Sequence, residues 1–385
     1  RDRYQPMSDF PSMPQHAARF ADYGFRDIQT SPLMLYYEVT QACDLVCKHC
    51  RASAQPQPHA EELTTELAKV LIDQASSFSK KPNMVFTGGD PLKRRDLFQL
   101  LEYAVARGLN VALTPSATPL ATSDALRQAR MAGVSALGLS LDAAEASTHD
   151  AFRGWEGSFA RSLEILEAAR SLGFYIQVNT TITRRNVEQI DAMAELLRAF
   201  GIHMWSVFFL VPVGRGILEE RILPEEYEQV FARLWYHAQR QPYAIKTTEA
   251  PHYRRYVLEV LRQEGGQDFD MSSLPPAVKR LATGIGDGKG IMFVSHIGEI
   301  YPAGFLPLVC GRFPEVSIVD VYQNHRVFRE LRDPDLLKGK CGTCAYRAIC
   351  GGSRARAYAV TGDYLAAEPD CVFQCEPGRP LIPVR

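Results

Sequence analysis

Three cysteines, Cys43, Cys47 and Cys50, lie within eight residues in the stretch QACDLVCKHC, which follows an apolar run. Their spacing would also place them on one face of a helix, as small buried hydrophobic residues. Against that interpretation, charged residues are interleaved with the cysteines and no apolar stripe continues. A structural zinc ion takes four protein ligands at tighter paired spacing. Thiolates are the usual ligands of a four-iron cluster, and three of them leave one iron open for a small chelating molecule.

A second group of cysteines occupies the C-terminal part of the chain: Cys341, Cys344, Cys350 and Cys371. Four thiolates complete a four-iron cluster with no open position, which suits electron transfer. Four cysteines also satisfy a tetrahedral zinc ion, so a zinc ribbon is the alternative.

Two of the nine cysteines, Cys310 and Cys375, belong to neither group. We expect each to be a buried or surface thiol, with Cys375 as the reserve ligand because it lies four residues past Cys371. Closely spaced cysteines in a chain without a recognisable export signal favour metal ligation over disulfides. This pattern predicts a cytoplasmic location.

The segment CDLVCKHC resembles the CxxxCxxC signature of the radical S-adenosylmethionine (radical SAM) superfamily. The resemblance implies a [4Fe–4S] cluster with one open iron, and reductive cleavage of SAM to a 5′-deoxyadenosyl radical that abstracts a substrate hydrogen. It places His49 where the family has an aromatic residue near the adenine. VFTGGDP resembles the family's GGE motif, which implies that Gly88, Gly89 and Asp90 bind the SAM amino group. Two adjacent glycines also allow close backbone approach and positive φ.

Further contacts to SAM are implied by the same resemblance. Ser140 and Asp142 alternate along one predicted strand and suit the ribose hydroxyls, with a solvated strand end as the alternative. Arg153 resembles an arginine that pairs with the SAM carboxylate, for which a planar guanidinium is well matched; a surface arginine is the alternative. Asn179 and the turn around Val211 are expected near the ribose and adenine.

The tail resembles the SPASM/twitch domains that hold auxiliary clusters. Only six cysteines remain after the first three, and Ala303 stands where such relatives carry a ligand cysteine, so we expect one auxiliary [4Fe–4S] cluster. The segments CKHCRASA, FFLVPVGRG and CGGSRARAYAVTGD resemble enzymes of alternative haem synthesis and nitrite-reductase haem maturation. This implies oxidative decarboxylation or another side-chain modification of a tetrapyrrole, with Arg354 and Arg356 as candidate anchors for an acidic group. An ordinary charged face is the alternative for these arginines.

Two other functions remain open. One is a maturase of a ribosomally synthesised precursor peptide, and the other is an iron–sulfur electron carrier or redox sensor without radical chemistry. An enzyme that modifies a tetrapyrrole and one that modifies a peptide would both need an external electron donor such as flavodoxin or ferredoxin.

The elements that must position these residues alternate between β-rich runs and amphipathic helices. Six strands are predicted, at residues 33–40, 82–89, 110–116, 136–142, 175–183 and 204–214. Strands joined by helices predict an α/β fold with a parallel sheet, which either lies open or curls into a full or partial barrel. The resemblance to radical SAM enzymes implies a partial (β/α)6 barrel. Ligand groups should lie at the carboxyl ends of the strands.

The expected organisation has four parts. They are an N-terminal strap (1–33), the partial barrel (34–216), a helical bridge (217–283) and a small α+β auxiliary domain (284–385). The bridge is expected to contain helices at 223–241 and 250–264 and a loop at 265–276. The last part begins with a predicted hairpin at 284–304.

Composition excludes several classes of protein. The 385 residues carry a net charge of −1, with 46% hydrophobic and 23% charged residues, as in a soluble globular protein. A near-neutral net charge gives no indication of a surface that binds nucleic acid. No apolar run is long enough for a membrane span, and no signal peptide is recognisable at the start.

Overall fold

The computed structural model describes residues 23–265, 284–376 and 381. Their core is one ten-stranded sheet with the order β10-β9-β8-β1-β2-β3-β4-β5-β6-β7. The strands are β1 (Met34–Glu38), β2 (Asn83–Thr87), β3 (Asn110–Leu113), β4 (Ala136–Ser140), β5 (Tyr175–Ile182), β6 (Met204–Phe209), β7 (Ala244–Thr248), β8 (Ile291–Val294), β9 (Glu299–Tyr301) and β10 (Gly311–Arg312).

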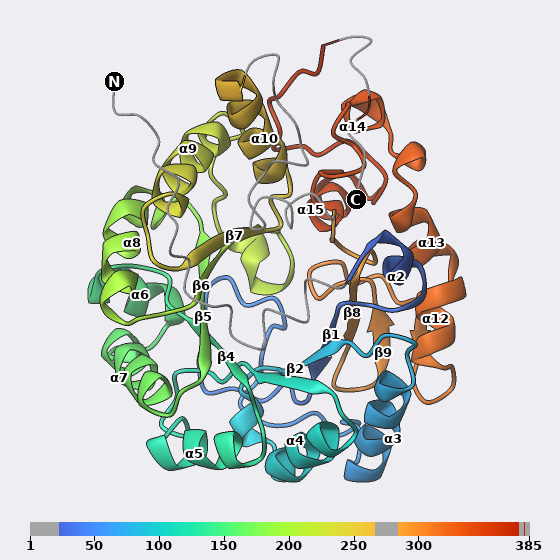
Figure 1. The fold of residues 1–385 in the computed structure, drawn as a ribbon. Helices are drawn as coiled ribbons and strands as arrows, with labels where there is room; N and C mark the ends of the chain where they lie inside the picture. Colours follow the sequence, from blue (N-terminus) through green and yellow to red (C-terminus); the bar gives the residue numbers. More distant parts are fainter. Residues whose placement is uncertain (1–22, 266–283, 377–380, 382–385) are drawn as a thin grey trace.

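Helices surround the curved sheet, as Figure 1 shows. Those of the barrel are α3 (Thr65–Ser76), α4 (Leu97–Ala106), α5 (Ser123–Met131), α6 (Ala146–Arg153), α7 (Ser158–Ser171), α8 (Ile190–Ala199), α9 (Glu226–Ala238) and α10 (His252–Gly265). Outside it lie α2 (Phe25–Thr30), α12 (Ile318–Asn324), α13 (Arg326–Arg332), α14 (Gly339–Thr343) and α15 (Arg354–Thr361). Short 3-10 turns follow β2, precede α8, follow β6 and precede α14: η1 (Pro91–Lys93), η2 (Val187–Gln189), η3 (Gly214–Leu218) and η6 (Pro334–Leu336).

All six predicted strands are present, and they pair in parallel in chain order as β1 to β6. The predicted α/β partial barrel is therefore confirmed. The sheet does not close, because its edge strands are β7 and β10.

Local sequence explains where the helices begin and end. Thr64 and Thr122 precede α3 and α5, and each hydroxyl accepts a hydrogen bond from a backbone N–H in the first turn. Gly154 ends α6 in the left-handed conformation, with φ 72°, which glycine adopts without strain. In β5, buried and half-buried residues alternate, so one face of the sheet packs on helices and the other faces the barrel interior.

Strand β7 was not predicted, because the stretch 217–283 was expected to be helical. Ala244–Thr248 is short and contains a lysine and two threonines, so it lacks the apolar run that marks the other strands. It pairs in parallel with β6 and extends the sheet. The two helices expected around it are present as α9 and α10, whereas most of the loop expected at 265–276 lies outside the described residues.

The predicted hairpin is present as β8 and β9, which pair antiparallel. β8 also pairs in parallel with β1, since Met34 lies opposite Ile291. The C-terminal part thus continues the sheet of the barrel at the β1 edge.

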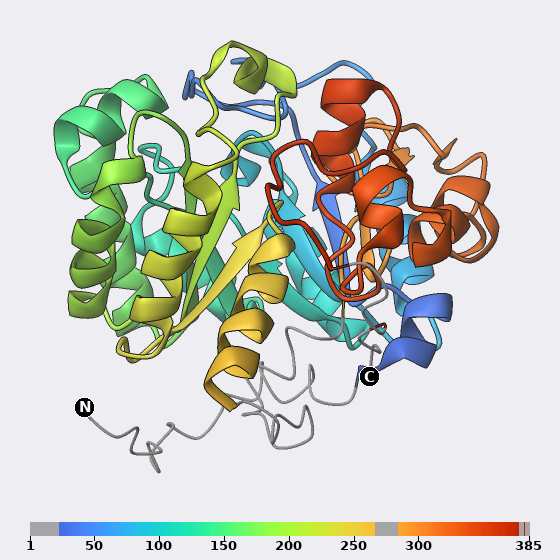
Figure 2. The ribbon, with the colours of Figure 1, turned by 90° about the horizontal axis from the view of Figure 1, so that it is seen from above.

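Helices α12 to α15 gather beside the barrel, on the side away from α5 to α8 (Figures 1 and 2). α15 lies near both β7 and β8 (Figure 1). In the described ranges, no helix combines the length and the hydropathy that a membrane span needs.

Candidate active site

The first three cysteines lie in the loop that follows β1. Residues 39–64 contain no helix, so the interpretation of the cysteines as core-helix positions is wrong. Cys43 and Cys47 are buried and Cys50 is half-buried. They form a small apolar cluster apart from the main core, with Leu45, Ala54 and Trp155.

Each of these sulfurs has a donor within reach: Leu45 N–H at 3.4 Å from Cys43, Arg153 Nη1 at 3.8 Å from Cys47 and Ala54 N–H at 3.5 Å from Cys50. Burial raises the pKa of Cys43 to about 11. Burial also raises the pKa of Cys47, although the positive charge of Arg153 opposes it. Donors of this kind stabilise the thiolate form that binds metal.

The two glycines after β2 let the chain pass close to the cysteine loop. A Cβ on Gly88 would lie 2.5 Å from the Thr40 carbonyl oxygen, and one on Gly89 would lie 2.5 Å from that of Ala42. Neither glycine has the positive φ that the sequence suggested. The requirement for glycine here is close packing against the cysteine loop.

The Asp90 carboxylate is fully buried and serves its own loop. It accepts hydrogen bonds from Thr118 Oγ1 at 2.6 Å and from the Leu92 N–H at 3.2 Å, which caps η1. Burial raises its pKa. In this arrangement the backbone around Gly88 and Gly89, rather than the Asp90 side chain, lies nearest the cysteine loop.

Asp142, Arg153 and His49 form a buried polar cluster beside Cys47. Asp142 lies two residues past the end of β4, and its Oδ2 is 2.5 Å from Arg153 Nη2 and 3.7 Å from His49 Nε2. The His49 ring packs on Phe152, with centroids 4.1 Å apart, and burial lowers its pKa to about 4, so the imidazole is neutral. Arg153 thus already pairs with a carboxylate of its own chain, and its Nε is buried without a hydrogen-bond partner among the described residues.

Ser140 and Asn179 lie side by side on adjacent strands. Ser140 is in register with Asn179, and Asn179 with Ser206 on β6. Val211, by contrast, packs its side chain into the main core.

Sequence reasoning missed Arg215, which follows β6 in η3. Its Nε donates to the Cys47 carbonyl oxygen at 2.8 Å and its Nη1 to that of Ala54 at 3.0 Å. Gly214, with φ 56°, allows this approach, because a Cβ there would lie 2.3 Å from the Arg51 carbonyl oxygen. The signal available in the sequence was the Gly-Arg-Gly run at 214–216.

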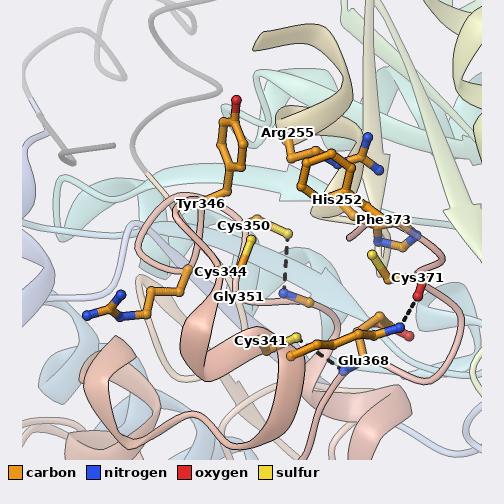
Figure 3. Close-up of a pocket in the computed structure, with 13 residues that line it drawn as sticks. His252, Arg255, Cys341, Cys344, Tyr346, Cys350, Gly351, Glu368, Cys371 and Phe373 are labelled. Carbon is orange, nitrogen blue, oxygen red and sulfur yellow. Dashed lines mark hydrogen bonds between the residues drawn. The ribbon is translucent and has the colours of Figure 1, made fainter. Parts of the chain in front are cut away.

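The four C-terminal cysteines line one cavity, shown in Figure 3, together with His252, Arg255, Lys340, Tyr346, Glu368 and Phe373, among others. Two of the sulfurs accept backbone N–H groups, Cys341 from Glu368 at 3.3 Å and Cys350 from Gly352 at 3.4 Å. Nowhere in residues 23–265 or 284–376 does a group of three or more His, Cys, Asp or Glu side chains have the spacing that holds a metal ion.

The two remaining cysteines differ in position. Cys310 is buried in the main core, and burial raises its pKa to about 12. Cys375 is near the cavity without lining it, since its sulfur accepts the Ala345 N–H at 3.3 Å and it interacts with Cys344. Ala303 is also buried in the main core.

Arg354 and Arg356 are buried and bond groups of their own chain. Arg356 is 0% exposed and lies 3.2 Å from both Glu368 Oε1 and Asp370 Oδ2. It also donates to the carbonyl oxygens of Phe209 and Glu249. The Arg354 Nη1 donates to backbone carbonyls at 2.6 and 3.0 Å. The interpretation as an ordinary charged face is wrong for both residues, because the two side chains are buried. The prediction of a substrate anchor is wrong for Arg356, because carboxylates of its own chain already pair with it.

Residues 37–212 match the family described as the radical SAM superfamily. An AdoMet-dependent heme synthase from Methanosarcina barkeri is 40% identical to this chain over 349 residues, 91% of this chain and 98% of the relative. The chain belongs to the radical SAM superfamily. A second AdoMet-dependent heme synthase, from Oleidesulfovibrio alaskensis, is 37% identical over 89% of this chain and 87% of the relative. The mycofactocin maturase of Mycolicibacterium smegmatis is 30% identical over 89% of this chain and 83% of the relative.

Solved structures of radical SAM enzymes share the fold. Streptococcus suis SuiB bound to its precursor peptide SuiA gives a TM-score of 0.69 at 15% identity, over 96% of this chain and 84% of SuiB. The anSMEcpe structure with bound AdoMet gives 0.66 at 15% identity, over 88% of this chain and 93% of that chain. At such identities the likeness shows the fold alone.

Radical SAM enzymes use a [4Fe–4S] cluster and SAM, and the residues around the first cysteine loop fit both groups. Three thiols, two of them buried and one half-buried, supply the donor set for a cluster with one open iron. Around them, His49 Nδ1, Arg153 Nε and Arg215 Nη2 are buried without hydrogen-bond partners in the described part of the chain. Buried polar atoms are normally satisfied, so these three indicate room for a polar ligand.

Proposed function

We propose that this radical SAM enzyme removes carboxylate groups from the side chains of a tetrapyrrole haem precursor. The support is the 40% identity to an AdoMet-dependent heme synthase along 98% of that relative's length. Cys43, Cys47 and Cys50 would hold the SAM-binding cluster at the carboxyl ends of the strands, where parallel α/β sheets bind ligands. When bound, the cluster and SAM supply a reagent that abstracts a hydrogen atom.

Decarboxylation of the substrate leaves an electron that the second cysteine site would accept. Removing a hydrogen atom from a propionate side chain and breaking its bond to the carboxylate releases carbon dioxide, forms a carbon–carbon double bond and leaves one electron over. We propose that Cys341, Cys344, Cys350 and Cys371 hold an auxiliary [4Fe–4S] cluster that accepts this electron. A closed set of four thiolates suits that role. The parts 34–216 and 284–385 would then be a SAM-binding domain and an auxiliary domain.

Lys246 on β7 offers a partner for a substrate carboxylate in place of Arg354 and Arg356. It is in register with Ser206, which is in register with Asn179, so the three side chains share one face of the sheet. Its neighbour Ile245 packs on the main core, and Lys246 therefore points to the barrel interior. Burial and the nearby Arg254 lower the pKa of Lys246 to about 8.

The reaction also requires a donor of electrons to the first cluster. We propose that a flavodoxin or ferredoxin reduces the first cluster and that the enzyme works in the cytoplasm. Reducing conditions there preserve free thiols.

The experiment is an anaerobic assay of the reconstituted enzyme with SAM, a strong reductant and a tetrapyrrole bearing propionate groups. The expected result is 5′-deoxyadenosine together with a product lighter by the elements of formic acid for each side chain converted. Cleavage of SAM without any change in the tetrapyrrole would favour the alternative substrate, a precursor peptide, for which the 30% identical mycofactocin maturase is the support. Absence of SAM cleavage would favour an electron carrier.

A further inference from the structure

His252 is a buried histidine on α10 whose ring nitrogens have no hydrogen-bond partner among the residues that the structure describes. It is the first residue of α10, is 1% exposed and lines the cavity that also contains the four C-terminal cysteines (Figure 3). In the described part of the chain, neither Nδ1 nor Nε2 has a hydrogen-bond partner. Buried side-chain polar atoms in native proteins nearly always have one, so a partner for His252 is missing.

The ring is held in place by aromatic packing. It lies against Tyr227, with centroids 5.0 Å apart, and edge-on to Phe231, with centroids 4.9 Å apart. Because these contacts cover the ring, it cannot turn outward to find water as a partner. The missing partner must therefore lie in the cavity that His252 lines.

Charge around the cavity favours an anionic occupant. Arg255 is 3% exposed and bonds Glu228, and its guanidinium also lies over the Phe373 ring at 4.4 Å. Lys340 donates to the Cys371 carbonyl oxygen. In either protonation state the imidazole carries at least one N–H, which requires an acceptor.

The backbone already supplies one donor to each thiol. Besides the N–H groups on Cys341 and Cys350, those of Tyr346 and Phe373 face Cys344 and Cys371. His252 adds a side-chain N–H to the same cavity, and Figure 3 shows it on the same side of the cavity as Cys371.

We propose that His252 donates an N–H···S hydrogen bond to the auxiliary [4Fe–4S] cluster and thereby raises the cluster's reduction potential. This inference rests on the proposed auxiliary cluster. Hydrogen bonds to the sulfurs of such clusters are one of the factors that set their potentials, because they stabilise the more negative, reduced state. His252 is a positioning and tuning residue in this account, and it makes the cluster a better acceptor for the electron left by the substrate.

The test compares two substitutions in full-length protein whose Cys43, Cys47 and Cys50 are replaced by alanine, so that only the auxiliary cluster titrates. His252→Phe keeps a ring but removes the donor, whereas His252→Gln keeps an N–H. The expected result of an EPR-monitored redox titration is a lower midpoint potential for His252→Phe and a potential near the parent for His252→Gln.

A matched control is His237→Phe. His237 is also a buried histidine, but it lies on α9, bonds Asp191 at 2.8 Å and does not line the cavity. This variant should titrate like the parent.

A second readout needs no change to the chain's packing. In protein labelled with ¹⁵N-histidine, pulsed EPR of the reduced auxiliary cluster should show a weak nitrogen coupling, which disappears in His252→Gln. Equal potentials for all variants with full iron content, equal shifts for Phe and Gln, or absence of the nitrogen coupling would overturn the inference. A parent protein without a second cluster by iron analysis would overturn the auxiliary-cluster proposal as well, and that outcome is distinct.

Discussion

The two cysteine sites of this enzyme are built in different ways. The first has three thiols within eight residues, and its neighbours come from several other loops: Gly89 after β2, Asp142 after β4, Arg153 at the end of α6 and Arg215 after β6. The second draws its four thiols from residues 341–371, and its cavity is lined mainly by that segment and α10. A site assembled from many strand ends can bind a changing ligand, whereas one closed by its own segment suits a permanent group.

The largest effect should follow from removing the first set of thiols. Replacement of Cys43, Cys47 and Cys50 by alanine should abolish both SAM cleavage and substrate turnover, because the open iron is lost. The iron and sulfide content of the protein should fall by one cluster of about four irons, while the second cluster remains. Cys310→Ala is the matched control, since that buried thiol lies in the main core and should leave both clusters in place.

Removing one thiol of the second site should separate two activities. Cys350→Ala should retain SAM cleavage to 5′-deoxyadenosine but lose the decarboxylated product, because the surplus electron has no acceptor. Chromatography of both products from one anaerobic reaction measures this. Equal loss of both activities would show that the two sites do not divide the chemistry as described.

The ion pairs of Arg356 should dominate the stability of the C-terminal part. Arg356→Ala would leave Glu368 and Asp370 buried without their cation, which costs about 3–5 kcal/mol in comparable buried pairs. Urea unfolding of the apoprotein should show this loss. Arg347→Ala is the control, because its partner Asp335 is 72% exposed and such pairs contribute about 0–1 kcal/mol.

The buried His149 beside the first site should make stability depend on pH. Burial lowers its pKa from 6.5 to about 4. Between pH 6.5 and about 4, His149 therefore binds a proton in the unfolded chain but not in the folded chain. The free energy of unfolding falls as the pH drops through this range. The contribution is on the order of 3 kcal/mol, at about 1.4 kcal/mol for each pH unit. Unfolding at several pH values should show a shallower fall for His149→Gln; an unchanged slope would contradict it.

A smaller effect is expected from Lys246. Lys246→Met should raise the KM for the tetrapyrrole about tenfold, which corresponds to about 1.4 kcal/mol, while SAM cleavage without substrate stays unchanged. Lys246→Arg should recover most of the affinity, since the charge is retained. A KM at the parent value for Lys246→Met would place the substrate carboxylates elsewhere.

Much of the fold followed from sequence because the strands β1 to β6 are β-rich runs separated by amphipathic helical patterns. β7 could not be predicted from the sequence, since AIKTT has no apolar stripe. Its pairing with β6 makes this stretch a strand. The thiols could be found from spacing alone. Arg356 could not be interpreted correctly, because its partners lie twelve and fourteen residues later and at the end of β6, and only the folded chain brings them together.

The orphaned nitrogens of His252 were likewise beyond sequence reasoning. A histidine at the start of an amphipathic helix is ordinary, and only the packing of Tyr227 and Phe231 around it shows that it must find a partner in the cavity. The glycines after β2 illustrate a partial success. Close backbone approach was predicted for them toward a ligand, whereas the structure shows close approach to the cysteine loop.

The most direct test of the account is whether SAM binds the cluster held by Cys43, Cys47 and Cys50. In full-length protein with Cys341, Cys344, Cys350 and Cys371 replaced by alanine, the reduced cluster should give an EPR spectrum that changes when SAM is added and shows coupling to ¹⁵N in the amino group of labelled SAM. A spectrum that SAM leaves unchanged, from a fully loaded cluster, would contradict the central claim.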